Sequence, residues 1–172
     1  MLKIWNISEN ELSLSKSFED GGFQVISLTH QRFAYSSGTN VKIRNENNFD
    51  VITSLSHQGS VYTIVQLTKK DVLVSSCWGP KSIDFWDLNT YKKLHSIQDY
   101  YSYYPQHLIE LQNGHIAVSE YSSPCPIVII EPDNYSIVKK IQVEGYITGY
   151  SSICSWKYNS FIYVYGGKFL QI

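Results

Sequence analysis

One five-residue pattern returns along the chain and constrains its fold more than any other feature. It reads apolar–x–apolar, then Trp or another bulky residue, then Asp, Asn or Glu. Copies begin at Leu2, Val41, Ile83 and Ile127, and a weaker copy begins at Phe169. A short alternating strand that recurs about every 40 residues is typical of a solenoid or a propeller blade. Such a unit cannot bury its own apolar face, so we expect successive units to stack on one another.

Composition favours sheet over helix and excludes several classes of partner. Charged residues make up 17% of the chain and aromatic residues 15%, whereas about 25% charged residues is usual. Aromatic and β-branched residues suit strands, and low charge argues against disorder. The formal net charge is −1 and no run of Lys or Arg exceeds two residues, so we expect no nucleic-acid surface. No apolar run approaches the roughly 20 residues of a membrane helix, so we expect no membrane partner.

The cysteines and the start of the chain favour a cytoplasmic protein, without excluding the nucleus. Cys77, Cys125 and Cys154 have neither the pairing of a disulfide framework nor the spacing of a zinc site. We therefore expect reduced thiols. Polar residues follow Met1 too soon for a signal peptide.

Period-two alternation predicts 17 strands and little helix. Two strands open the chain, near residues 2–6 and 12–18. Three complete units of four strands follow, and a last unit supplies three more. The repeats end near residues 6, 45, 87, 131 and 172. Within the third complete unit, Gln112-Asn113-Gly114 predicts a hairpin with a type I′ turn.

The second complete unit resembles the WD-repeat β-propeller family. Its entry His57-Gln58-Gly59, its strand ending in Ser75-Ser76 and its close Phe85-Trp86-Asp87 carry the likeness. The resemblance implies an all-β propeller of about four four-stranded antiparallel blades, in one domain over residues 1–172. It also implies a buried His–Ser–Asp–Trp network. The structural residues implied by the resemblance are His57, Ser75, Ser76, Trp86 and Asp87, with His57 donating a hydrogen bond to Ser75 or Ser76.

This sequence departs from the family pattern at several positions. The family has an Asp in the tight turn before the third strand, where this chain has Gly79-Pro80-Lys81, so we expect only a partial network. Asp20 stands near one expected His, and Arg44 and Ile130 replace Trp in other units. Apolar stacking should therefore hold the blades together, with Trp5 and Trp86 packed between them.

The terminal strands do not decide whether the propeller closes into a ring. The first and the last strands of the chain are both third strands of a unit, so they duplicate each other. Three arrangements are consistent with that count: an arc of a larger propeller completed by another polypeptide, a self-closed four-blade ring, or a ring of two copies. An unpaired terminal strand invites aggregation, so we expect something to cover it.

The sequence gives no support to an enzyme. It contains no Gly-x-Ser-x-Gly elbow, no phosphate-binding glycine loop and no Cys-His cluster with zinc spacing. We accordingly expect no catalytic residues, no metal and no cofactor.

A tyrosine-rich segment, residues 99–107, is the one suggestive cluster. In WD-repeat proteins the corresponding connection lies on the loop face, beside the central channel. The resulting aromatic rim consists of Trp78, Tyr100, Tyr101, Tyr103, Tyr104 and Tyr121. Such residues are favoured at binding hot spots, so the rim predicts docking of a peptide or protein. Alternatively, the segment folds back on itself or packs on an adjacent blade.

Two functions follow from these observations. The first is a non-catalytic protein–protein interaction scaffold of WD-repeat type. The second is a structural subunit whose terminal strands are completed by another chain or by a second copy.

Overall fold

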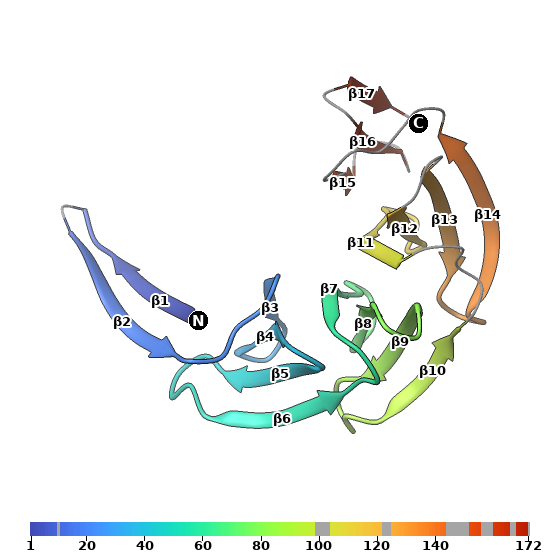
Figure 1. The fold of residues 1–172 in the computed structure, drawn as a ribbon. Coiled ribbons are helices and arrows are strands. Elements are labelled where there is room, and N and C mark those ends of the chain that lie inside the picture. Colours follow the sequence, from blue (N-terminus) through green and yellow to red (C-terminus); the bar gives the residue numbers. More distant parts are fainter. Residues whose placement is uncertain are drawn as a thin grey trace.

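An open arc of antiparallel sheets makes up this protein, seen here in a computed structural model (Figure 1). The structure describes residues 1–9, 11–98, 104–121, 125–143, 152–155, 160–165 and 168–171. These ranges contain strands, turns and loops but no helix. None of this described part could therefore cross a membrane as a helix.

Five sheets follow one another along the chain. The N-terminal hairpin pairs β1 (Leu2–Ile7) with β2 (Leu12–Phe18). Blade 1 consists of β3 (Val25–Leu28), β4 (Arg32–Ser37), β5 (Asn40–Asn45) and β6 (Val51–Ser56). Blade 2 consists of β7 (Val61–Gln66), β8 (Val72–Cys77), β9 (Ser82–Asp87) and β10 (Lys93–Ile97). Blade 3 consists of β11 (Tyr104–Glu110), β12 (Ile116–Tyr121), β13 (Cys125–Glu131) and β14 (Ser136–Val143). The C-terminal sheet consists of β15 (Ser152–Ser155), β16 (Phe161–Tyr165) and β17 (Lys168–Gln171).

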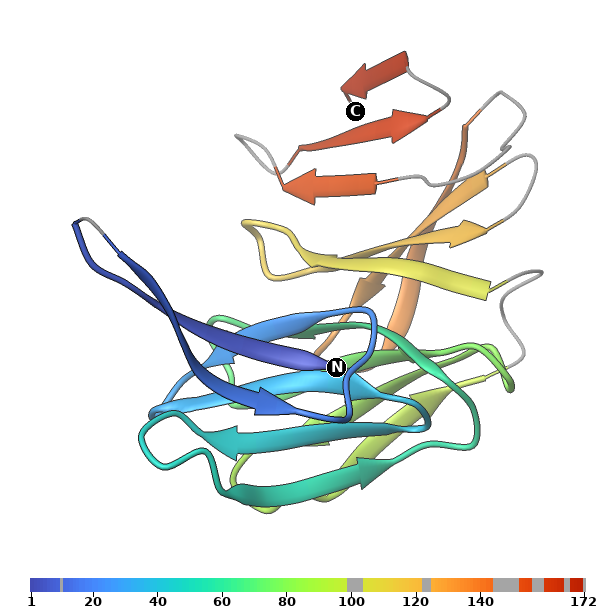
Figure 2. The same cartoon turned by 60° about the vertical axis from the view of Figure 1, so that its left-hand side comes forward.

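The sheets are arranged radially, as the repeat pattern predicts. Figure 1 shows β3, β7, β11 and β15 on the inside of the arc and β6, β10 and β14 on the outside. The arc is open between the N-terminal hairpin and the C-terminal sheet, and Figure 2 shows the hairpin extending away from the blades. The predicted fold class is confirmed as an arc, and the self-closed four-blade ring is not formed.

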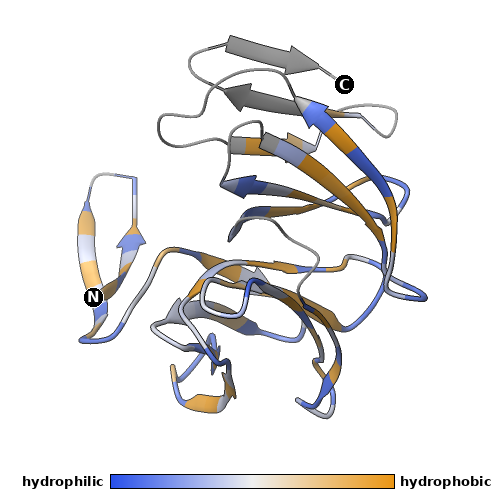
Figure 3. Ribbon diagram, turned by 45° about the vertical axis from the view of Figure 1, so that its right-hand side comes forward, coloured by the Kyte–Doolittle hydropathy of each residue, from blue (hydrophilic) through white to orange (hydrophobic). Residues whose placement is uncertain are grey.

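Both faces of the central blades are buried by side chains that alternate along the strands, and Figure 3 shows hydrophobic residues along these strands. Leu73 and Trp86 of blade 2 pack toward blade 1, whereas Val74 and Phe85, one residue along each strand, pack toward blade 3. The interface of blades 1 and 2 is formed by Leu28, Ala34, Val41, Ile43, Leu55, Val61, Ile64, Leu73, Trp86 and Leu88. The interface of blades 2 and 3 is formed by Leu67, Val74, Ile83, Phe85, Ile97, Leu108, Ile116, Val118, Val128 and Ile130. The smaller interface of blade 3 with the C-terminal sheet is formed by Leu111, Ala117, Ile127, Ile129, Ile153 and Phe161.

An aromatic residue in left-handed backbone geometry closes the turn between the third and fourth strands of every complete blade. Phe49, Tyr91 and Tyr135 have φ values of 63°, 57° and 59°, which are uncommon for bulky residues. Asp87 stabilises one such turn, because its Oδ1 accepts hydrogen bonds from the backbone N–H groups of Asn89 and Thr90. These bonds, first that from Asn89, lower the pKa of Asp87. The structure thus places Asp87 at an exposed turn and outside the buried network.

Two local expectations are wrong. Trp5 does not pack between blades, since it is 45% exposed on the N-terminal hairpin. The predicted hairpin at Asn113 forms, but Gly114 alone has positive φ there, at 89°. A type I′ turn needs positive φ at two residues, so this is a three-residue loop with a left-handed glycine.

Candidate functional site: an exposed aromatic row

Four aromatic rings from three successive blades form a continuous row. The rings of Phe23 and Tyr62 stack at 4.3 Å with an interplanar angle of 9°. Tyr62 meets Trp78 edge-on at 5.3 Å and 87°, and Trp78 meets Tyr104 at 5.1 Å and 90°. Phe23 is 67% exposed and Trp78 is 43% exposed. We call these four residues the aromatic row.

A chain of hydrogen bonds positions Phe23 over the next blade. Ser36 Oγ, fully buried on β4, accepts hydrogen bonds from the backbone N–H groups of Phe23 and Gln24 at 2.8 and 3.1 Å. The Gln24 side chain continues across the interface, where its Oε1 accepts from Thr63 Oγ1 and from the N–H of Ile64, each at 2.7 Å. Both donor residues, Thr63 and Ile64, lie on β7, beside Tyr62. The stacking of Phe23 on Tyr62 is thereby fixed by polar contacts beneath it.

Close backbone packing holds Trp78 at the surface. The N–H of Trp78 donates to the carbonyl oxygen of Ser60 at 2.8 Å. A Cβ atom added at Gly59 would lie 2.6 Å from the backbone nitrogen of Gly79, so the two loops approach each other more closely than any other residue at position 59 would allow. Their backbone contact leaves the indole of Trp78 facing outward.

The structure brings together some members of the predicted rim. Trp78 and Tyr104 touch, and Tyr121 pairs with Tyr104 in the register of β11 and β12 and is exposed. Tyr100, Tyr101 and Tyr103 lie outside the described residues. Trp78 packs on Tyr104 of the adjacent blade and stays exposed. The alternative expectation, that residues 99–107 fold back or pack on a blade, falls mostly on residues outside the described ranges.

Two members of the row were missed by the sequence analysis. Phe23 follows Gly21-Gly22 immediately before an inner strand, and Tyr62 alternates with buried neighbours on β7. An aromatic residue beside an inner strand in two successive repeats is the signal that could have identified them.

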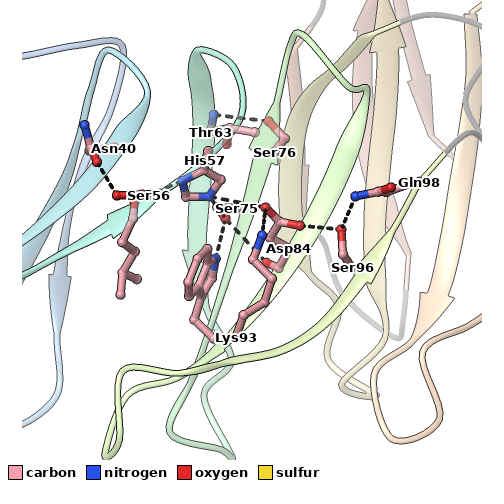
Figure 4. Close-up of polar contacts among 12 residues, drawn as sticks. Asn40, Ser56, His57, Thr63, Ser75, Ser76, Asp84, Lys93, Ser96 and Gln98 are labelled. Carbon is pink, nitrogen blue, oxygen red and sulfur yellow. Dashed lines mark hydrogen bonds and ion pairs between the residues drawn. The ribbon is translucent and has the colours of Figure 1, made fainter.

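A second cluster, the buried network of blade 2, surrounds Ser75 (Figure 4). Nδ1 of His57 lies 3.0 Å from the carbonyl oxygen of Leu55, which can only accept, so Nδ1 carries the proton. Nε2 of the neutral ring then accepts from Ser75 Oγ at 2.7 Å. Ser75 in turn accepts from Trp86 Nε1 at 3.0 Å. The predicted direction, with His57 donating to Ser75, is therefore reversed.

Asp84 supplies the carboxylate that the sequence seemed to lack. It lies within β9, almost fully buried, with Oδ2 3.7 Å from His57 Nε2. Lys93 pairs with the same oxygen at 2.9 Å, and Ser96 donates to Oδ1 at 2.5 Å. Ser76 makes a different contact: its Oγ accepts a hydrogen bond from the backbone N–H of Thr63 at 3.3 Å. The network thus obtains its carboxylate from a strand and not from the turn.

In blade 1, charged residues occupy the positions of this network. By strand register, Tyr35, Lys42 and Arg44 stand where blade 2 has Ser75, Asp84 and Trp86. Asp20 accepts a hydrogen bond from Tyr35 and pairs with Lys42. The bond from Lys42 lowers the pKa of Asp20.

Blade 3 fills the same register positions with Val118, Val128 and Ile130, all buried. Ser119 takes the place of Ser76, and its fully buried hydroxyl has no hydrogen-bond partner among the described residues. At the same register positions, blade 1 therefore has ionic contacts, blade 2 has hydrogen bonds and blade 3 has apolar contacts.

The buried network is closed off from solvent. The side chain of His57 is inaccessible to solvent, and burial lowers the pKa of its imidazole against the opposing effect of Asp84. Within the described ranges, no group of three or more His, Cys, Asp or Glu side chains could hold a metal ion.

Comparison with solved structures identifies the fold. The chain is similar to the WD40 β-propeller domain of Doa1, with a TM-score of 0.72 and 17% identity over 96% of this chain and 55% of that chain. The chain has the fold of a WD40 β-propeller. It is also similar to the dihydro-heme d1 dehydrogenase NirN in complex with DHE, with a TM-score of 0.65 and 12% identity over 77% of this chain and 31% of that one. The WD40-like chain thus spans little more than half of the first structure and about a third of the second. No protein-family model and no curated protein matches it.

We expect Ser75→Ala to destabilise the WD40-like arc by about 1–3 kcal/mol, because His57 Nε2 and Trp86 Nε1 each lose their hydrogen bond to Ser75 and stay buried. Ser119→Ala is the matched control. It removes an equally buried hydroxyl that has no partner, so the free energy of unfolding should change by less than about 0.5 kcal/mol. Urea unfolding of both variants measures the difference. Equal losses would show that the hydrogen bonds of Ser75 contribute nothing specific.

The free energy of unfolding should fall as the pH drops below about 6.5, the usual pKa of histidine. The pKa of His57 is lowered in the folded state, so between the two pKa values the unfolded chain binds more protons and is favoured. The stabilisation is complete above pH 6.5 and is lost toward lower pH. Urea unfolding at pH 7.5, 6.5 and 5.5 tests this. His57→Gln should unfold more easily at pH 7.5 but with a smaller pH dependence, and an unchanged dependence would refute the assignment to His57.

Proposed function

We propose that this chain is a non-catalytic scaffold that docks a peptide or protein partner on its loop face. The observation that carries the proposal is the aromatic row, in which four rings from three blades touch one another and Phe23 and Trp78 remain exposed, whereas Tyr62 and Tyr104 are half-buried. A single exposed aromatic side chain is ordinary, whereas a contiguous group is typical of an interaction site.

The residue types in the aromatic row, and the hydrogen bonds that hold them in place, favour binding. Trp and Tyr lose little conformational entropy on binding and dominate interface hot spots. Trp78 is fixed by its backbone bond to Ser60, and Phe23 by the buried Ser36. A partner would therefore meet a surface that is already ordered, which lowers the entropic cost of association.

A non-catalytic role agrees with the placement of the ionisable groups. The side chains of His57 and Asp84 are only 0% and 3% exposed, and they are engaged with Ser75 and Lys93. The cytoplasmic setting belongs to the same proposal. It is supported by Cys77 and Cys154, which are free thiols, as is usual in a reducing compartment.

A random peptide display library tests the docking surface directly. The chain should select peptides whose capture is reduced at least tenfold by Trp78→Ala, since a central Trp commonly contributes 2 kcal/mol or more to binding. Trp5→Ala is the matched control, because Trp5 is equally exposed but lies on the N-terminal hairpin. Capture should survive that change, and the thermal midpoint should survive both. Selected peptides that bind the Trp78→Ala variant equally well would place the docking surface elsewhere.

A second candidate, a structural subunit completed by another chain or copy, is favoured by the N-terminal hairpin. Cross-strand register places Trp5 opposite Leu14 and Ile7 opposite Leu12. All four side chains are exposed, with Ile7 at 84%. A two-stranded sheet with an uncovered apolar face is marginal in water. Strands added beside β1 would complete this sheet as a blade. A neighbouring sheet supplied with them would cover its apolar face, as neighbouring sheets do for the complete blades.

If a second copy supplies those strands, native mass spectrometry of the chain should show a multimer. Replacing Leu12 and Leu14 together by Asp should yield monomers, because charge on that face opposes burial. Val138→Asp, an equally exposed site on β14, should leave the multimer intact. A wild-type chain that is monomeric throughout would remove the second-copy form of this candidate.

A further inference from the structure

We propose that the segment bound by the aromatic row is proline-rich and lies across the blades as a polyproline II helix. This inference rests on the proposed docking function and names the chemistry of the ligand. Backbone geometry, ring orientation and charge each favour it independently.

The path of the row excludes strand addition. Phe23 precedes β3 of blade 1, Tyr62 and Trp78 belong to blade 2, and Tyr104 begins β11 of blade 3. A segment that follows these rings crosses from sheet to sheet and cannot continue the hydrogen-bond ladder of any one of them. A polyproline II segment needs no ladder, because its backbone polar groups are not paired internally and remain open to solvent. Among extended conformations, polyproline II therefore loses the fewest backbone hydrogen bonds on such a path.

The orientation and spacing of the rings suit prolines. Trp78 stands perpendicular to Tyr62 on one side and to Tyr104 on the other, so the surface is ridged. Proline rings dock against ridged aromatic surfaces of this kind. Trp78 lies 5.3 Å from Tyr62 and 5.1 Å from Tyr104, so the two outer rings can be no more than about 10 Å apart, a limit that accommodates the roughly 9 Å that three residues of polyproline II advance. Prolines three positions apart would therefore lie on opposite sides of Trp78.

Trp78 also offers a donor for the ligand backbone. Its indole N–H has no acceptor among the described residues, and the side chain is substantially exposed. Carbonyl groups of a polyproline II segment project outward without partners. An indole N–H that donates to one of them would fix the position of the segment along the row.

A cationic ligand fits the row less well. The rings touch one another, at centroid distances of 4.3 to 5.3 Å, and leave no cage that could enclose an ammonium group. Lys81 already places its ammonium nitrogen 5.5 Å from the centroid of Tyr104. A second positive charge at this end would be repelled.

Calorimetric titration with a decaproline peptide tests the inference. The 172-residue chain should bind decaproline saturably, and a Gly-Ser decapeptide should not bind measurably, since it lacks both the rings and the pre-formed helix. Trp78→Ala should raise Kd at least tenfold, and Trp5→Ala should leave it unchanged. Trp78→Phe keeps a ring but removes the N–H, so it should raise Kd by a smaller factor. Thermal unfolding of each variant confirms that the fold is retained.

The contrary outcomes separate this inference from the docking proposal. If decaproline binds no better than the Gly-Ser peptide, or if a trimethyl-lysine peptide binds more tightly, the polyproline assignment is wrong. If display then yields peptides without proline that depend on Trp78, the docking function stands alone. If display yields no peptide that depends on Trp78, both proposals fall together.

Discussion

Apolar packing between neighbouring sheets is the constraint on which the rest of this structure depends. Each central sheet presents one set of alternating side chains to the preceding sheet and the other set to the following sheet. Sheets pack on both faces of blade 2, so its middle strands β8 and β9 are buried along most of their length. Any polar side chain in that blade must find its partners within the protein, since an unpartnered buried polar group costs about 1–3 kcal/mol. The closed arrangement of His57, Ser75, Asp84 and Trp86 is a consequence of this burial.

The same constraint explains how the repeats can differ so much in sequence. Blade 1 has the N-terminal hairpin and not a full blade before it, and both Asp20 and Lys42 remain 29% exposed. An ion pair is tolerable there because water reduces its desolvation cost. Blade 3 uses Val118 and Val128 at the corresponding positions and needs no partners at all. At these register positions, polar side chains are paired where they occur, and the residue types vary from blade to blade.

The regular features of the fold could be predicted from the sequence, and the contacts between distant repeats could not. Period-two alternation and the recurring five-residue pattern give the order of the strands, because both reflect burial on alternate faces. The carboxylate of Asp84 was missed because an acidic residue in mid-strand does not reveal its partners on the next strand. There Lys93 forms an ion pair with it and Ser96 donates a hydrogen bond to it. The exposure of Trp5 was missed because an alternating strand is expected to be covered. A further signal was visible but unused: an acidic or amide residue precedes an aromatic by four positions at Asn45–Phe49, Asp87–Tyr91 and Glu131–Tyr135, where the structure has its left-handed turns.

The aromatic row joins this frame to its proposed function. Its rings come from loops and strand ends, which can vary without disturbing the interfaces, but their anchors are buried. Ser36 has the same register position as Ser76, and both hydroxyls accept N–H groups at the start of an inner strand. A serine that belongs to the repeated framework therefore fixes the position of Phe23. The close contact of Gly59 with Gly79 fixes the position of Trp78 at the surface. Both anchors are formed in the unbound protein. The spacing of the rings is therefore fixed, while the types of aromatic residue in the row can change. This is the condition under which weak aromatic contacts from separate blades can act together on one extended ligand.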